Sequence, residues 1–239
     1  MGKVILFMMD KMWNNKKIVL FDLDGTLTDP GLGITNSVMH ALHRYGIEVS
    51  DRTELYKFIG PPLNESFERF YGFEKEEAYR AVDVFREYFK VKGLFENEVY
   101  AGIERLLKEL KKQGKILCLA TSKPEVFAKQ ILEYFCLDGY FDRIVGSLLN
   151  GERTNKAEVI AWVLQCLNED GISWNLNQIV MIGDREHDVI GAHKNDIPAI
   201  GVLFGYGNED ELKTAGADDL AASVDELYEM LVGRKEICV

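Results

Sequence analysis

Two carboxylates separated by one residue follow an apolar run near the N-terminus, and this arrangement most constrains the fold. The run Lys17-Ile-Val-Leu-Phe21 is typical of a buried β-strand, and Asp22-Leu-Asp24-Gly25 follows it directly. Strand alternation would direct Asp22 and Asp24 to one face, and Gly25 permits a sharp turn with positive φ. Crowded carboxylates repel each other unless a cation or a shared proton intervenes. The pattern therefore predicts a divalent-metal site, with one carboxylate free to attack and the other to move protons.

Helix and strand patterns alternate from Glu98 to the C-terminus. Apolar residues spaced at i, i+3, i+4 and i+7 predict helices, and short apolar runs predict buried strands. Such alternation is typical of βαβ units and of a parallel sheet covered on both faces. We expect an α/β fold with a Rossmann-like sheet, with strands at 115–121, 144–145, 178–183 and 199–203 and helices at 103–113, 126–135, 156–168, 188–194, 209–215 and 224–231.

Residues 30–97 interrupt this alternation. Their apolar and aromatic residues recur at helical spacing without a strand pattern, which predicts a small helical bundle inserted after the first strand, with the aromatics as its core. The predicted domains are an α/β core of 17–29 and 98–239, a helical domain of 30–97, and an N-terminal extension of 1–16 without an assigned role. An upstream start is one explanation of the extension, with Met9 and Met12 as the alternative starts.

The composition limits the partners. The formal net charge is −11 and the basic residues are dispersed, which disfavours nucleic-acid polymers and acidic membranes. The apolar run Val4–Met9 is too short to span a membrane and lacks a signal-peptide cleavage site. Nothing in the sequence requires more than a monomer or a weak homodimer. Because no Cys-x-x-Cys spacing occurs, we expect a cytoplasmic protein with reduced, mostly buried thiols among Cys118, Cys136, Cys166 and Cys238.

Four segments resemble, in order, the motifs of the haloacid dehalogenase (HAD) superfamily. Asp22-Leu-Asp-Gly-Thr-Leu-Thr-Asp29 is similar to the first motif, Asp-x-Asp-Gly-Thr-[Leu/Val]. Thr121 closes an apolar strand, as in the second motif, and Lys156 precedes a helix, as in the third. The fourth segment, Ile182-Gly-Asp184-Arg-Glu-His-Asp188, is similar to the fourth motif. The helical segment resembles the C1 cap of subfamily IA in size and position, so the resemblance covers nearly the whole chain.

The resemblance implies a role for each matching residue. Asp22 would be the nucleophile, Asp24 the general acid and base, and Lys156 the cation that orients Asp22 and offsets charge. Asp22, the backbone carbonyl of Asp24 and Asp184 would hold Mg²⁺, with Asp188 as an outer-sphere support. Phosphate oxygens would be held by the remaining candidates, which are Gly25, Thr121, Ser122 and Lys123.

Neighbouring polar residues receive weaker interpretations. Arg153 is a candidate neighbour of the site without a firm role. Glu186 and His187 are expected to face solvent or to cap the following helix. The histidines without metal-like companions, to which we assign no role, are His40, His43 and His193.

The function implied is that of a Mg²⁺-dependent phosphatase acting on a small phosphorylated metabolite through a phospho-aspartyl intermediate. The segments 28–37, 58–63 and 180–185 look most like bacterial phosphoglycolate phosphatase-like proteins, among whose relatives are 5′-nucleotidases. The substrate would be phosphoglycolate-like or a nucleoside 5′-monophosphate. Gly60-Pro61-Pro62 is either a stiff cap loop facing the substrate or a plain helix–helix turn.

Two alternatives stay open at this point. A sugar-phosphate mutase of the β-phosphoglucomutase type shares the cap and the motifs, although Asp29-Pro30 departs from the Asp-Thr common there. A non-catalytic phosphate- or nucleotide-binding module is the other. Gly205-Tyr-Gly207 follows a strand but lacks the third glycine of the dinucleotide fingerprint, and no phosphate-loop motif is present.

Overall fold

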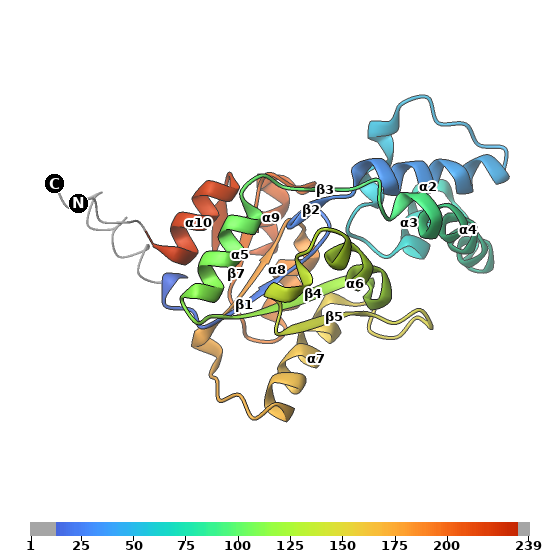
Figure 1. Cartoon of the computed structure of the whole chain (residues 1–239). Helices are drawn as coiled ribbons and strands as arrows, with labels where there is room; N and C mark the ends of the chain where they lie inside the picture. The colour runs from blue at the N-terminus through green and yellow to red at the C-terminus, as the bar shows by residue number, and fades with distance from the viewer. Residues whose placement is uncertain (1–12, 234–239) are drawn as a thin grey trace.

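The computed structural model describes residues 13–233, and its core is a six-stranded parallel sheet in the order β5-β4-β1-β6-β7-β8 (Figure 1). The strands are β1 (Ile18–Phe21), β4 (Ile116–Pro124), β5 (Arg143–Ser147), β6 (Ile179–Gly183), β7 (Ala199–Val202) and β8 (Asp219–Ala221). β1 pairs with β4 on one side and with β6 on the other, so the strand order reverses at β1. This confirms the predicted α/β class.

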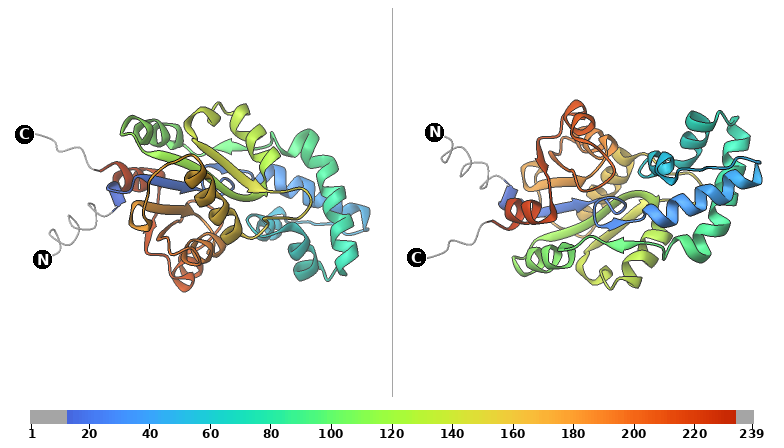
Figure 2. Two further views of the ribbon diagram at one scale, coloured as in Figure 1. Left: turned by 90° about the horizontal axis from the view of Figure 1, so that it is seen from below. Right: turned by 90° about the horizontal axis from the view of Figure 1, so that it is seen from above.

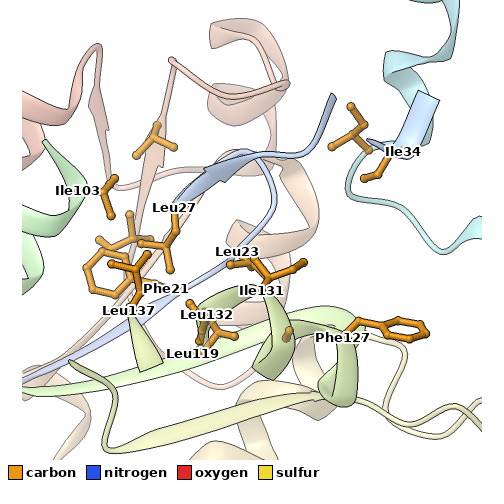
Figure 3. Close-up of a cluster of buried hydrophobic side chains, with 14 of the residues drawn as sticks. Phe21, Leu23, Leu27, Ile34, Ile103, Leu119, Phe127, Ile131, Leu132 and Leu137 are labelled. Carbon is orange, nitrogen blue, oxygen red and sulfur yellow. The ribbon is translucent and has the colours of Figure 1, made fainter. Parts of the chain in front are cut away.

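Six helices cover the two faces of this sheet. They are α5 (Ile103–Lys112), α6 (Glu125–Tyr134), α7 (Lys156–Glu169), α8 (Glu186–His193), α9 (Glu209–Ala215) and α10 (Val224–Val232). Alternate residues of each strand point to opposite faces. Val19 and Phe21 pack with α5, α6 and α10, part of which Figure 3 shows, whereas Ile18 and Leu20 pack with α7, α8 and α9.

A helical insert, residues 30–97, leaves and re-enters the core through a two-stranded antiparallel ribbon of β2 (Thr28–Asp29) and β3 (Glu98–Val99). It lies at the opposite end of the molecule from α10 (Figure 1 and Figure 2). It consists of α2 (Gly31–Arg44), the 3₁₀ helix η1 (Arg52–Phe58), α3 (Leu63–Tyr71), α4 (Lys75–Tyr88) and the π-helical turn η2 (Phe89–Gly93). As expected, the aromatics form its core, with Phe58 and Phe67 at 5.1 Å between ring centroids.

Several elements differ from the sequence expectations. The ribbon β2–β3 and the edge strand β8 were not expected, because strands of two or three residues carry too little periodicity to detect. β4 runs past Thr121 to Pro124, with an irregular register against β5 between Ala120 and Pro124. Pro124 thus ends β4 and directly precedes α6.

The assignment of residues 13–16 to an extension without a role is wrong. Trp13 is 1% exposed, and its indole Nε1 donates to Asp219 Oδ2 at 2.8 Å. Lys115 Nζ donates to the backbone oxygens of Asn14 and Lys16 at 2.6 and 2.7 Å. This segment therefore closes the amino edge of the sheet. The alternative starts Met9 and Met12 lie outside the described residues.

The expectation of buried thiols holds for one of the cysteines that the structure describes. Cys118 is buried in β4, and burial raises the pKa of its thiol to about 12. Cys136 is exposed, at a turn with φ of 57°, and Cys166 is half-buried on α7. Cys238 lies outside the described residues. Within residues 13–233, no helix combines the length and apolarity that a membrane crossing requires.

Trp13→Ala should lower the free energy of unfolding by about 3–5 kcal/mol, because it leaves a cavity and removes the hydrogen bond to Asp219 Oδ2. Trp13→Phe keeps most of the packing and should cost clearly less. Urea denaturation followed by circular dichroism measures both. The control is Trp162→Ala, whose side chain is 41% exposed and whose loss should cost about 0.5 kcal/mol or less. Equal losses for Trp13→Ala and Trp162→Ala would contradict the assignment of Trp13 to the core.

Candidate active site

Several of the predicted site residues lie at the carboxyl edge of the sheet, beside the strand where the order reverses. Asp22 follows β1, Asp184 follows β6, and Thr121 lies near the end of β4. Lys156 begins α7 and Asp188 lies in the first turn of α8. Open α/β sheets bind ligands at such a reversal, because the two neighbouring loops diverge and leave a crevice.

The turn after β1 depends on Gly25. Its φ is +80°, and the amide donates to Thr28 O at 2.8 Å, which folds the chain back on itself. A Cβ at this position would lie 2.1 Å from Asp184 Oδ2. Glycine is therefore required both for the turn and for the close approach of a carboxylate. These contacts explain why a glycine stands here. The expected role of Gly25 in phosphate binding stays a prediction.

Lys156 joins the nucleophile candidate to α8. Its ammonium lies 2.8 Å from Asp22 Oδ1 and 2.7 Å from Asp188 Oδ1, and donates to Ala120 O at 3.0 Å. Burial lowers the pKa of Lys156, but the attraction of Asp188 and Asp22 outweighs burial and leaves that pKa raised. Lys156 is thus charged and fixed in place, and Asp22, 5% exposed, also accepts from the Leu23 amide at 2.7 Å.

The carboxylates of Asp22, Asp184 and Asp188 form a buried acidic cluster whose oxygens lie within 4.8 Å of one another. Burial and the neighbouring Asp188 and Asp22 raise the pKa of Asp184 well above its ordinary value. Burial likewise raises the pKa of Asp188 to about 6. Three carboxylates against the single ammonium of Lys156 leave an excess of negative charge, and oxygen donors are what Mg²⁺ prefers. The residues therefore fit a divalent cation.

Asp24 is not part of this cluster and pairs with a different lysine. Its Oδ2 lies 2.5 Å from the ammonium of Lys123, which also lies 4.8 Å from the ring centroid of Phe89 in the insert. Its Oδ1 is buried without a hydrogen-bond partner among the described residues. Burial raises the pKa of Asp24, and Lys123 opposes this. A buried carboxyl with a raised pKa and one free oxygen is suited to donating and accepting a proton.

A cavity of about 590 Å³ lies between the core and the insert. Its core side includes Asp24, Ser122 and Lys123, and its insert side includes Gly60-Pro61-Pro62 and several aromatics. The Gly-Pro-Pro segment joins η1 to α3, as a helix–helix turn does, and it also lines the cavity. That it faces the substrate stays a prediction. Thr121 is 2% exposed, and its hydroxyl accepts from the Lys123 amide at 3.2 Å.

The remaining polar residues considered from the sequence lie outside the acidic cluster. Arg153 reaches Glu125 Oε2 at 3.4 Å, away from the acidic cluster. Glu186 and His187 are half-buried and so face solvent only in part, and the side chain that caps α8 is that of Asp188, which accepts from the Arg185 amide at 3.1 Å. The histidines without an assigned role contact surface carboxylates, at 3.5, 3.5 and 3.0 Å for His40, His43 and His193.

Sequence reasoning missed the loop between β7 and α9. The Tyr206 amide donates to Asp184 Oδ2 at 2.8 Å, so this loop supports the acidic cluster. A Cβ at Gly205 would lie 2.2 Å from Gly25 O, and one at Gly207 would lie 1.9 Å from Asp184 O. The paired glycines were therefore the available signal. They mark a close backbone approach to the site rather than a dinucleotide fingerprint.

Comparison with known proteins agrees with this geometry. Residues 19–202 match the model of the haloacid dehalogenase-like hydrolase family. The chain is 46% identical to a 5′-nucleotidase of Pseudomonas aeruginosa, over 89% of this chain and 94% of that protein. It is 36% identical to the tyrosine-protein kinase PtkA of Mycobacterium tuberculosis, over 90% of this chain and 72% of that protein. A phosphoglycolate phosphatase of Aquifex aeolicus is a more distant relative, at 28% identity.

A solved structure gives the same result for the fold. The crystal structure of a phosphatase from Clostridium acetobutylicum, described as a predicted one, superposes with a TM-score of 0.87. It is 52% identical and the match covers 92% of this chain and 99% of that one. The resemblance inferred from the four motifs is confirmed.

Asp184→Asn should raise the unfolding temperature measured with a chelator, because the amide keeps the shape and removes a charge that burial and two neighbouring carboxylates disfavour. The same variant should lose the increase that Mg²⁺ gives the wild type, since a ligand stabilises only a protein that binds it. Differential scanning fluorimetry with EDTA and with Mg²⁺ measures both effects. Asp138→Asn, an exposed change, is the control. Full stabilisation of Asp184→Asn by Mg²⁺ would contradict the metal assignment.

Proposed function

The chain belongs to the haloacid dehalogenase-like hydrolases, and from this premise we propose that it is a Mg²⁺-dependent phosphatase that forms a phospho-aspartyl intermediate. Family membership and relatives named 5′-nucleotidase and phosphoglycolate phosphatase make it a phosphoric monoester hydrolase. The observation that carries the mechanism is the separation of two carboxylates. Asp22 is held by Lys156 within the acidic cluster, whereas Asp24 pairs with Lys123 at the cavity.

In the first step Asp22 attacks the phosphorus of the substrate. A bond forms between a carboxylate oxygen of Asp22 and phosphorus, and the bond from phosphorus to the leaving oxygen breaks. Asp24 gives its proton to that oxygen, so that an alcohol leaves rather than an alkoxide. Lys156 holds Asp22 in orientation and offsets the negative charge on the transferring group.

In the second step water hydrolyses the phospho-aspartyl group. Asp24, now ionised, takes a proton from the water as its oxygen bonds to phosphorus, and the bond from phosphorus to Asp22 breaks. Inorganic phosphate leaves, and both carboxyl groups return to their initial states. Thr121 and Ser122 are the hydroxyls that we assign to the phosphate, with Gly25 and Lys123 as the further candidates. Ser122 lies at the cavity wall, and the Thr121 hydroxyl accepts from the Lys123 amide, which leaves its own proton free to donate.

Asp22 and Asp184 are the side chains we assign to the metal, together with the backbone carbonyl of Asp24. Asp188 belongs to the same acidic cluster and forms an ion pair with Lys156, which suits a supporting role. Mg²⁺ bound there supplies electrostatic stabilisation of charge on the phosphoryl oxygens.

We assign the role of a cap to the helical insert. Its aromatic residues Phe58, Phe85 and Phe89 line the cavity opposite Asp24, so the insert contacts the part of the substrate that does not react. The ribbon β2–β3 is its sole covalent connection to the core, which suits a hinge. A cytoplasmic location and a monomeric or weakly dimeric state stay predictions from the sequence.

The cavity favours a nucleoside 5′-monophosphate over phosphoglycolate. A volume of about 590 Å³ lined by aromatic rings suits a base and a ribose. Phosphoglycolate would require a second free cation for its carboxylate. The cations at the cavity are already engaged, since Lys123 pairs with Asp24 and Arg86 lies 3.4 Å from Asp83. The name of the Pseudomonas aeruginosa relative agrees with this choice.

Phosphate release should depend on Mg²⁺ and be faster from nucleoside 5′-monophosphates than from 2-phosphoglycolate. A panel of these compounds with sugar phosphates and p-nitrophenyl phosphate, assayed with Mg²⁺ and with EDTA, measures it. Asp22→Asn should lower turnover by more than about 10³-fold, because it removes the nucleophile. Asp138→Asn is the matched control. Release by Asp22→Asn at a rate near that of the wild type would exclude the covalent mechanism. Sugar-phosphate isomerisation without release would favour the mutase, and no reaction at all would favour the binding module.

Asp24→Asn should separate the two proposed steps. With p-nitrophenyl phosphate the leaving group needs little protonation, so the first step should survive while hydrolysis of the intermediate slows by about 10²–10⁴-fold. The expected result is a burst of about one nitrophenol per protein in stopped flow. Intact-mass spectrometry should then find one added phosphoryl group, located on Asp22. Steady release at the wild-type rate, without a burst, would show that Asp24 is not the base.

A further inference from the structure

Two core side chains that the mechanism does not use contact the helical insert from the two loops that hold Asp184. Arg185 directly follows Asp184, and the Tyr206 amide bonds to the Asp184 carboxylate. Both side chains then extend to the η1 region of the insert and to its first residues. The loops that fix a carboxylate of the acidic cluster are therefore also the loops on which the insert rests.

Tyr206 contacts three separate parts of the molecule. Its amide donates to Asp184 Oδ2 at 2.8 Å. Its hydroxyl donates to Asp29 Oδ1, and the same oxygen accepts from the Gly31 amide at 2.9 Å, at the point where β2 leads into α2. Its ring lies 5.3 Å from that of Tyr56 in η1, edge to face. One side chain thus connects the acidic cluster, the exit to the insert and the insert itself.

The Tyr206 hydroxyl fits closely at the beginning of α2. A Cβ at Gly31 would lie 2.2 Å from it, so any larger residue there would displace the tyrosine. Burial and the bond to Asp29 raise the pKa of Tyr206, which keeps the hydroxyl protonated and able to donate. The contact is a directed hydrogen bond in a close-fitting site and not an incidental approach of two surfaces.

Arg185 makes the second connection. Its Nη1 donates to the backbone oxygen of Ile59, and its Nε lies 2.8 Å from Glu211 Oε1 at the start of α9. The same Glu211 oxygen accepts from the Glu186 amide at 3.0 Å, which fixes the beginning of α8. Gly60, with φ of +104°, leaves space for the arginine, since a Cβ there would lie 2.9 Å from Arg185 Cγ. Gly60 begins the segment that lines the cavity.

We propose that Arg185 and Tyr206 are positioning residues that form a two-point clasp, holding the insert in its closed position over the cavity and aligning it with Asp184. Arg185 bonds directly to the backbone of Ile59 in the insert, whereas Tyr206 bonds to the Asp29 side chain, which in turn accepts from the Gly31 amide at the beginning of α2. Because the Tyr206 amide bonds to Asp184 and Arg185 directly follows it in the chain, opening of the insert disturbs the site, and closure restores it. The catalytic consequence rests on the proposed function, whereas the structural coupling does not.

Amide hydrogen exchange followed by mass spectrometry tests the clasp in the full-length protein without substrate. Tyr206→Phe keeps the ring and the Asp184 contact and removes the hydroxyl bond. Arg185→Gln removes the bond to Ile59. Each change should speed exchange by about fivefold in peptides covering 53–60 and 31–35, the expected effect of one lost hydrogen bond on local opening. Exchange in β1, β4 and β6 should be unchanged.

Matched controls are Tyr228→Phe on α10 and Arg143→Gln, whose arginine pairs with Asp170 on the surface far from the insert. Neither should alter exchange in the insert. In a phosphatase assay with p-nitrophenyl phosphate, both clasp variants should lower kcat by about fivefold and leave KM nearly unchanged, because the phosphate contacts persist while fewer molecules are closed.

Unchanged exchange in the insert for both clasp variants, with an unchanged unfolding temperature, would overturn the clasp. Faster exchange spread over the whole chain would assign the two residues to general stability instead, and would also overturn it. If no substrate is hydrolysed by the wild type, the proposed function fails, but the exchange result still decides whether the clasp exists. If exchange changes as expected while kcat does not, the insert is held but its position does not limit turnover, which would overturn the positioning role.

Discussion

The ammonium of Lys156, held between Asp22 and Asp188, is the interaction on which the rest of the site depends. Burying these charges is costly unless they are paired, and each partner comes from a different element, after β1, at the start of α7 and in α8. The pairing works only if those elements meet at one edge of the sheet. Glycines make the approach possible, since a Cβ at Gly191 would lie 2.8 Å from Lys156 Cγ. The charges thus constrain the backbone as much as the backbone positions the charges.

The acidic cluster keeps more negative charge than Lys156 neutralises, and this imbalance has a structural origin. Asp184 is completely buried, and the partners that approach its carboxylate are the Tyr206 amide at 2.8 Å and the Thr26 hydroxyl at 3.4 Å. Neutral donors orient a carboxylate without cancelling its charge. Such an arrangement preserves a site for a cation, whereas a second lysine would have filled it. The net charge of the whole chain, −11, adds to the same preference.

The sequence located the side chains of the acidic cluster better than the contacts that support them. Asp22, Lys156, Asp184 and Asp188 were found because each stands at a strand end or a helix start, where periodicity locates the residue and the motif order assigns it. The expected strands and helices of the core lie within a few residues of their observed bounds. Trp13, Arg185 and Tyr206 were missed because their partners lie far away along the chain. Trp13 bonds to Asp219 and Tyr206 to Asp29, and no local pattern encodes such pairs.

The acidic cluster and the cavity lining come from different parts of the chain. This offers a reason why similar proteins carry different names, such as 5′-nucleotidase and phosphoglycolate phosphatase. The residues proposed for the chemistry come from the edge of the sheet, where a small displacement would break the Lys156 network. The aromatic lining of the cavity comes largely from the helical insert, which the ribbon β2–β3 joins to the core. Substitutions in that lining would change the contacts to a bound substrate and leave the acidic cluster in place. The contacts of Arg185 with Ile59 and of Tyr206 with Asp29 are the ones that we propose to hold the insert in position over the site.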